Sequence, residues 1–275
     1  MVHVHRKGLI LRKQNNYLGS ALITIIGSYY LFVFIQQILF MLNNSLLHEE
    51  QRQLFPYYQI GDPELFKGDY LTSFLSGNQP ILYDLLTRGW LSLGGGLLEF
   101  HRVMPITLWI LLLASAALAG WKLKGVVGSL GAFALVLTQP LFLYQITSAI
   151  PHAFAFPLLG WAIVALLYGS VSGLAGLTLL SSVLYLPITP IIGLSLAGWL
   201  ILYYQEELKK FNTSTLTRII GIVGITGCLS IFLGFSVLQP KEEFGEPLAP
   251  FQEVEKYPEN GGRPTRAQLL IHIMA

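Results

Sequence analysis

Four acidic side chains lie within one short stretch and are the best candidates for chemistry. Glu49 and Glu50 are adjacent, and Asp62 and Asp69 follow in a segment with glycine, proline and aromatic residues. A carboxylate of this kind acts as a general base on a sugar or other hydroxyl acceptor, or holds a divalent cation. Acids beside glycine and proline also cap helices and form turns. A purely structural role for each acid therefore stays open.

Three further side chains are candidates for binding a substrate. Arg102 can hold a phosphate through two N–H groups, or anchor the chain among lipid headgroups. His152 either faces a polar cavity or lies partly hydrated at the membrane surface. Tyr70 can anchor Asp69 at the interface, and the preceding glycine frees the backbone there. The sequence holds no P-loop, nucleophile elbow, zinc-protease motif or cysteine pair, so no soluble-enzyme mechanism is indicated.

The composition indicates that membrane helices position these residues. Hydrophobic residues make up 53% of the chain. Charged residues make up 12%, against the roughly 25% of soluble domains. The mean hydropathy is +0.58. The net charge of +2 is too small to suggest a nucleic-acid partner. We therefore expect an all-α fold, a polytopic bundle of transmembrane helices whose partner is the lipid bilayer.

Seven apolar runs are candidate spans, because a bilayer core of about 30 Å needs roughly 20 apolar residues in helical form. The runs are too long for the strands of a barrel. Those flanking Pro187 and Pro190 are short, and one broken element or a re-entrant pair is the alternative to two spans. The predicted spans cover residues 17–42, 103–121, 125–145, 153–170, 174–186, 191–204 and 219–238.

Basic residues in short loops set the predicted orientation. Under the seven-span count, the N-terminus, the turn at Lys122 and the loop at Lys209 all fall on one side, which we place in the cytoplasm. The tail turns apolar again over 269–275, so we expect it to lead toward a further span of a longer protein. The chain then divides into a basic cytoplasmic N-terminus (1–16), a first span (17–42), an outer loop (43–102), a transmembrane bundle (103–238) and an outer tail (239–275).

The outer loop contains a predicted amphipathic helix over residues 80–93. Its apolar residues recur at helical spacing with polar residues between them, which is typical of a helix lying on a membrane surface. A run of three glycines, 94–96, ends it. The apolar stripe consists of Leu82, Leu85, Leu86, Trp90 and Leu93, and the polar residues are Asp84, Thr87, Arg88 and Ser92.

The order of these features resembles the membrane-embedded glycosyltransferases of the C superfamily (GT-C), which take sugars from polyprenyl-phosphate donors. Their first outer loop carries an acidic motif soon after the first span and a proline–aromatic element further on, where this chain has Glu49-Glu50 and residues 79–83. Residues 62–70 are similar to uncharacterised bacterial and cyanobacterial members. The family's Asp-Glu pair is Glu-Glu here, so Asp62 or Asp69 is an alternative catalytic acid.

The resemblance implies a sugar transferase at the outer face of a bacterial plasma membrane, with a lipid-linked sugar donor as partner. Asp69, then Glu49, Glu50 or Asp62, would activate the acceptor hydroxyl, while Arg102 would hold the donor phosphate. A divalent cation is a candidate cofactor. A transporter is one alternative, built around the break at residues 187–190, although transporters usually need ionisable residues in their spans. A non-catalytic assembly subunit whose loop binds a partner is the other.

Overall fold

The computed structural model describes residues 24–43, 54–60, 62, 64–65, 79–205 and 213–238, which all belong to one compact unit, Met1–Gln239. Within these ranges every regular element is a helix, and there is no strand. The all-α class is therefore confirmed. Four of the described helices are long and apolar enough to cross a membrane, which indicates a lipid-embedded protein: Thr24–Asn43, Leu97–Leu137, Leu186–Tyr203 and Ser214–Gly234.

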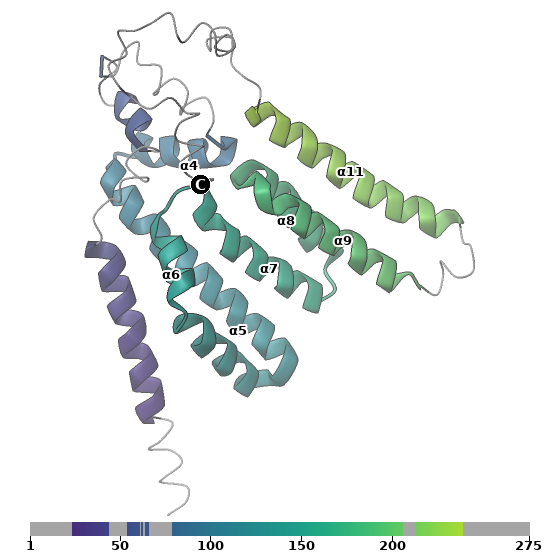
Figure 1. Ribbon diagram of the computed structural model, residues 1–275, viewed down its shortest axis with the longest axis horizontal. Coiled ribbons are helices and arrows are strands. Elements are labelled where there is room, and N and C mark those ends of the chain that lie inside the picture. Colours follow the sequence, from purple (N-terminus) through teal and green to yellow (C-terminus); the bar gives the residue numbers. More distant parts are fainter. Residues whose placement is uncertain are drawn as a thin grey trace, which may run out of the picture. The chain divides into compact units, whose positions relative to one another are not determined.

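The helix α5, Leu97–Leu137, is a hairpin of two helical arms (Figure 1). Lys124 and Gly125 leave the helical region, and Gly125 has a φ of 58°, which glycine adopts without strain. A side chain on Gly120 would collide with the backbone of Gly128, and the reverse also holds. In a straight helix these two residues would lie about 12 Å apart. The turn that the sequence predicts after Trp121 is thus present.

The second arm of α5 ends earlier than predicted. The span expected over 125–145 is interrupted at Thr138–Gln139, because Pro140 cannot continue the hydrogen bonding of the preceding turn. A short helix, α6 (Pro140–Thr147), follows it. The carbonyl of Leu137 is left at the end of the arm, and Gln37 of the helix Thr24–Asn43 donates its Nε2 hydrogen to it over 2.7 Å. This bond joins the first helix to the hairpin.

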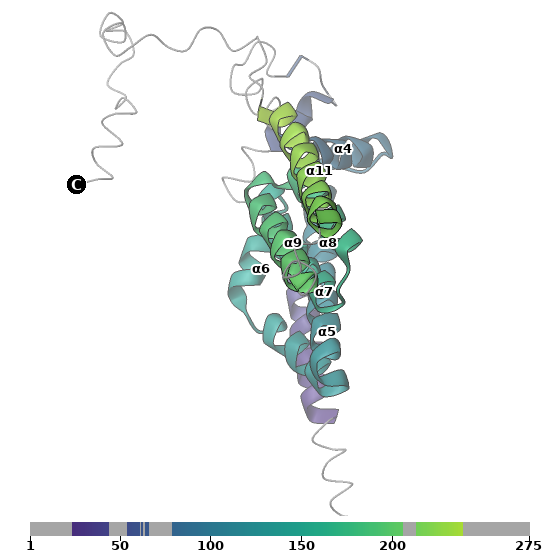
Figure 2. The same ribbon diagram turned by 90° about the vertical axis from the view of Figure 1, so that its right-hand side faces the viewer.

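The remaining helices pack in sequence order beside α5, as Figures 1 and 2 show. α7 contacts α5 and α8, while α9 and α11 both contact α8. Small residues permit close approach, since a side chain on Gly160 would collide with Ser115 of α5. The elements are η2 (Pro151–Phe154), α7 (Ala155–Leu167), α8 (Val171–Leu184), η3 (Leu186–Ile188), α9 (Thr189–Tyr203) and α11 (Thr213–Leu238).

The proline-rich break near residue 187 joins two separate helices. α8 ends before Tyr185, whose φ of −157° and ψ of 87° are not helical, and α9 begins with Pro190 in its first turn. The two helices run antiparallel, because Ser181 donates to Thr189 over 3.0 Å while Gly193 lies against Thr178. A single broken helix, one of the expected alternatives, does not describe this segment.

Candidate functional site at the α4 end of the bundle

The helix α4, Ile81–Ser92, crosses one end of the bundle and contacts α5 and α8. Together with the short helix η1 (Phe55–Ile60), the first turns of α5 and η2, it forms what we call the α4 end. A helix therefore occupies most of the segment predicted over 80–93, and its place on a membrane surface stays a prediction. Its buried side chains are Tyr83 and Thr87, whereas Leu85, Leu86 and Leu93 are exposed by 58%, 38% and 87%. The apolar stripe is thus divided, because Leu82 and Trp90 pack against the core while the other three leucines are exposed.

The turn from α4 to α5 is fixed by two local hydrogen bonds. Trp90 donates from its indole Nε1 to the carbonyl of Gly96 over 2.9 Å. The amide of Gly96 in turn donates to the carboxylate of Glu99 over 3.1 Å, which satisfies one of the donors at the start of α5. Because of this cap, α5 begins six residues before the predicted span at 103.

An aromatic cluster fills the interior of the α4 end. Tyr83 lies at its centre and is fully buried. The rings of Tyr57, Phe100 and Phe154 each meet the Tyr83 ring in an edge arrangement, with centroids 6.4, 6.2 and 6.3 Å away. Such edge contacts stabilise a core beyond the area that the rings bury. The cluster therefore holds η1, α4, α5 and η2 together as one rigid support.

The Tyr57 hydroxyl lies in a poorly solvated place next to a carboxylate. Burial raises the pKa of Tyr57 above its ordinary value, and the nearby Asp84 carboxylate and Tyr83 add to the shift. Asp84 itself accepts a hydrogen bond from Arg88, Nε to Oδ2, over 2.8 Å. This pair sits one turn apart on α4 with the Arg88 side chain 53% exposed, so it contributes little stability. Tyr57 thus stays a neutral phenol, whose buried hydroxyl has no hydrogen-bond partner among the described residues.

Arg102 is partly buried in the second turn of α5. Its Nε is shielded from solvent, and no hydrogen bond or ion pair joins Arg102 to another residue in the described part of the chain. Trp109, seven residues further, lies on the same face of α5 two turns along. Trp109 bonds to Gln37 of the first helix, so Arg102 lies on the face of α5 that packs toward that helix.

The other predicted site residues differ in what surrounds them. The Nε2 atom of His152, in η2, lies 3.1 Å from the Ser148 hydroxyl, so the imidazole is part of a local polar contact. Asp62 is exposed, and its carboxylate accepts from the amide of Glu64 over 3.2 Å, which is the turn role expected of an acid beside proline. The predicted acids Glu49, Glu50 and Asp69, with Tyr70, lie outside the described residues.

An apolar groove of about 370 Å³ runs between α4 and α5 on the side of the exposed leucines. Leu86, Trp90 and Leu93 of α4 line it together with Val103 and Thr107 of α5. Arg102 projects from a different face of α5, since one residue along a helix turns the side chain by about 100°. The cation and the groove therefore belong to different sides of the same helix.

Sequence reasoning missed Tyr57 and Tyr83 as parts of this site. It assigned α4 by its leucine stripe, most of which is exposed. Tyr83 and Thr87 lie one turn apart on the adjacent side of the helix, and this spacing was the signal for the protein-facing stripe. Tyr57 carries no comparable pattern, because η1 is too short to show a period.

Comparison with known proteins adds no relative. No protein-family model, no curated protein and no solved structure matches the chain. Among the described residues, no group of three or more His, Cys, Asp or Glu side chains is placed to hold a metal ion. The divalent cation therefore stays a prediction for the acids outside these ranges.

Proposed function

We propose that the chain is a glycosyltransferase-like membrane protein that transfers a sugar from a polyprenyl-phosphate donor at the outer membrane face. The observation that carries the proposal is Arg102, a partly buried guanidinium without a protein partner among the described residues. A cation held in this way favours an anionic ligand, and a guanidinium matches phosphate geometry. The donor phosphate supplies that charge.

The chain geometry supports an acid near the same place. The first helix ends at Asn43, and Glu49 follows six residues later, so even a fully extended chain carries it only about 20 Å from the helix end. Arg102 lies on the α5 face toward this helix. The chain length thus keeps Glu49 within about 20 Å of the end of the first helix, and we propose that it acts from there as the general base. Asp69, our first choice from sequence, remains a candidate without such a restriction.

The proposal includes seven spans, a cytoplasmic N-terminus and α4 lying at the outer interface. Its support comes from the end of the bundle opposite α4. There the ammonium of Lys122 lies 4.9 Å from the ring centroid of Tyr168, at the turn of α5 and the end of α7. Trp199 stacks on Tyr203 at the end of α9. Aromatic rings are enriched at both membrane interfaces, and a lysine in a short loop favours the cytoplasmic one.

A transporter is less well supported. The described helical segments 24–43, 103–121, 126–203 and 219–238 contain no Asp, Glu, Lys or Arg. Ion and proton pathways usually use such residues inside the membrane. An assembly subunit needs neither a sugar donor nor a catalytic acid. Binding of a polyprenyl phosphate therefore distinguishes a transferase from an assembly subunit.

The test is binding of a polyprenyl phosphate and of the matching polyprenol to the purified protein in lipid nanodiscs. Arg102→Ala should weaken binding of the phosphate by about 10- to 100-fold, as expected for a lost charge-assisted contact. Polyprenol affinity should stay unchanged, and Arg102→Lys should keep part of the phosphate affinity. Arg88→Ala is the matched control, because Arg88 already pairs with Asp84. Equal phosphate binding by wild type and Arg102→Ala would remove the proposal's main support.

A further inference from the structure

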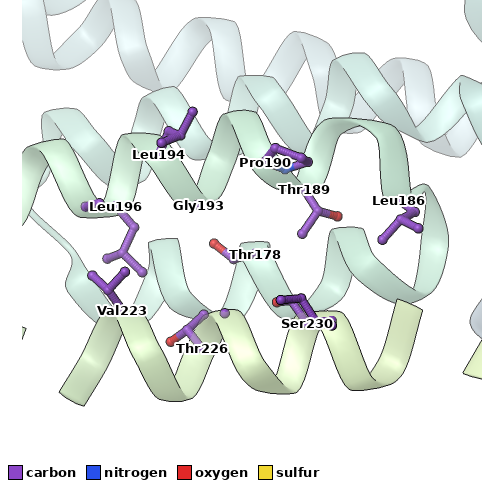
Figure 3. A pocket seen from close by; sticks show the side chains of 13 residues that line it. Thr178, Leu186, Thr189, Pro190, Gly193, Leu194, Leu196, Val223, Thr226 and Ser230 are labelled. Carbon is purple, nitrogen blue, oxygen red and sulfur yellow. The ribbon is translucent and has the colours of Figure 1, made fainter. Parts of the chain in front are cut away.

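A cavity of about 450 Å³ lies between α8, α9 and α11, and no residue of α4 lines it (Figure 3). Its size falls within the range of small-molecule sites, about 300–1,000 Å³. Gly193 of α9 and Gly227 of α11 line it, and a side chain on Gly227 would meet nothing within 4 Å. The missing side chain at Gly227 thus leaves open space on the α11 side.

Side-chain hydroxyl groups form the polar part of the cavity wall. Some of them are hydrogen-bonded within the protein, and at least one is not bonded to any described residue. On the α8–α9 side they are satisfied within the protein. Thr178 donates to the carbonyl of Leu174 over 2.8 Å, and Thr189 accepts from Ser181 over 3.0 Å. On α11 the Ser230 hydroxyl is not satisfied by the described part of the chain.

Ser230 and Thr226 are the two hydroxyl residues of α11 at the cavity. Ser230 is 4% exposed, and its Oγ makes no hydrogen bond to any described residue. Thr226 is 7% exposed. The two residues are four apart, so their side chains lie on one face of the helix, one turn from each other. Figure 3 shows both on the α11 side of the space.

The unpaired Ser230 hydroxyl is costly at this place. Serine and threonine inside a helix commonly bond to the carbonyl one turn back, as Ser195 does with Ile191 over 2.8 Å. Ser230 does not use this option. Water is scarce in the hydrocarbon region, and a buried polar group left alone costs about 1–3 kcal/mol. A ligand oxygen would remove this penalty.

The wall also restricts the charge of that ligand. No residue that lines the cavity is acidic or basic, and its surface is otherwise hydrocarbon with one proline. A phosphate, carboxylate or ammonium group would be buried without a counter-charge, which is strongly unfavourable. A hydroxyl is neutral and both donates and accepts, so it can accept from one α11 hydroxyl while donating to the other.

We propose that this cavity binds a long-chain lipid alcohol, with its hydrocarbon in the cavity and its hydroxyl bonded to Ser230 and Thr226. The ligand is neutral and so differs from the phosphate-bearing donor proposed for the α4 end. This site stands whether or not the protein transfers sugars.

Photolabelling tests the site with two probes of equal length, each carrying a diazirine on a saturated chain. One ends in a hydroxyl and the other in a methyl group. In nanodiscs, the alcohol should label α9 and α11 more strongly than the alkane, and unlabelled alcohol should compete. Ser230→Ala should lower labelling by the alcohol about 2- to 10-fold, which corresponds to one hydrogen bond, and leave labelling by the alkane unchanged.

The second variant fills the cavity with a side chain of the protein. Gly227→Leu places a side chain in the open space and should abolish labelling by the alcohol. Gly221→Leu is the matched control, because it lies on the same helix, also has free space at its Cβ and does not line the cavity. Equal labelling by both probes with no effect of Ser230→Ala would overturn the proposal. Cross-linking of α11 to a second copy of the chain in place of the probe would overturn it as well.

Discussion

The indole Nε1 of Trp109 donates a hydrogen bond to the side-chain carbonyl of Gln37 over 3.1 Å. The amide of Gln37 at the same time donates to the Leu137 carbonyl, so one side chain joins both arms of α5 to the first helix. Trp109 is fully buried, whereas the first helix is otherwise mostly exposed within the structure. The first helix is thus held by this polar contact together with a narrow apolar face that includes the buried Met41.

Replacing Gln37 with leucine should destabilise the protein. The change leaves the Trp109 N–H and the Leu137 carbonyl without their partner, at about 1–3 kcal/mol for an unsatisfied buried group. Gln36→Leu is the matched control, since Gln36 is exposed on the same helix and should tolerate an apolar side chain in lipid. Thermal unfolding in detergent measures both variants. Equal melting temperatures would show that the contact carries no stability.

The turn of α5 predicts opposite effects for two glycine substitutions. Gly120→Ala should destabilise the hairpin, because its Cβ would collide with the carbonyl of Gly128. Gly131→Ala should stabilise the second arm by up to about 1 kcal/mol, since nothing lies within 4 Å and alanine favours a helix. Chemical unfolding in mixed micelles compares them. A neutral effect at both positions would contradict the close approach of the arms.

High pH should destabilise the α4 end through Tyr57. Its pKa is raised in the folded protein, so the folded state keeps a proton that the unfolded state loses above the ordinary tyrosine value of about 10. The stabilisation is therefore complete below that pH and falls as the pH rises above it. Tyr57→Phe should flatten this decline, whereas Tyr58→Phe, at an exposed neighbour, should not. Melting curves between neutral and alkaline pH measure the difference.

One acid of the loop should be indispensable if the chain transfers sugars. Glu49→Gln, Glu50→Gln, Asp62→Asn and Asp69→Asn keep the shape of the side chain but remove its basicity. Loss of a general base lowers the rate by about 10²- to 10⁴-fold. We expect one variant to show this loss while still inserting in the membrane. The assay follows sugar transfer from a polyprenyl-phosphate donor, and full activity in all four variants would exclude the carboxylate mechanism.

Spin labels on α4 should distinguish its two exposed flanks. Leu86 and Arg88 are two residues apart and point about 200° apart around the helix. If α4 lies at a membrane interface, a label at Leu86 should be accessible to oxygen in lipid, and one at Arg88 to a water-soluble nickel chelate. Equal access of the chelate to both labels would place α4 in water.

Residues that impose a strict backbone requirement were predictable from the sequence. The turn after Trp121 follows from lysines beside Gly125, and the break near residue 187 follows from its prolines. The extent of α4 follows from its period and its terminal glycines. Each of these signals is local, because it depends on a φ preference, a missing N–H group or a helical repeat.

Contacts between distant segments were not predictable. Gln37 appears in the sequence as one of two polar residues in an apolar run, and only the fold distinguishes it from Gln36. The aromatic cluster joins Tyr57 to Phe154 through Tyr83, across almost a hundred positions of the chain. Pairings of this kind depend on which faces meet, and a single sequence contains no record of that.

The short length of α8 has a consequence for the surrounding lipid. Its 14 residues span about 21 Å, whereas the 26 residues of its neighbour α11 span about 39 Å. A bilayer core of about 30 Å cannot match both lengths at once. If α8 spans the membrane, as the seven-span proposal requires, lipid beside it would thin or the headgroups would lie closer to its ends, each at a modest cost per ångström. The protein would then be drawn to thinner patches of membrane, and polar molecules would approach its interior more closely there than elsewhere.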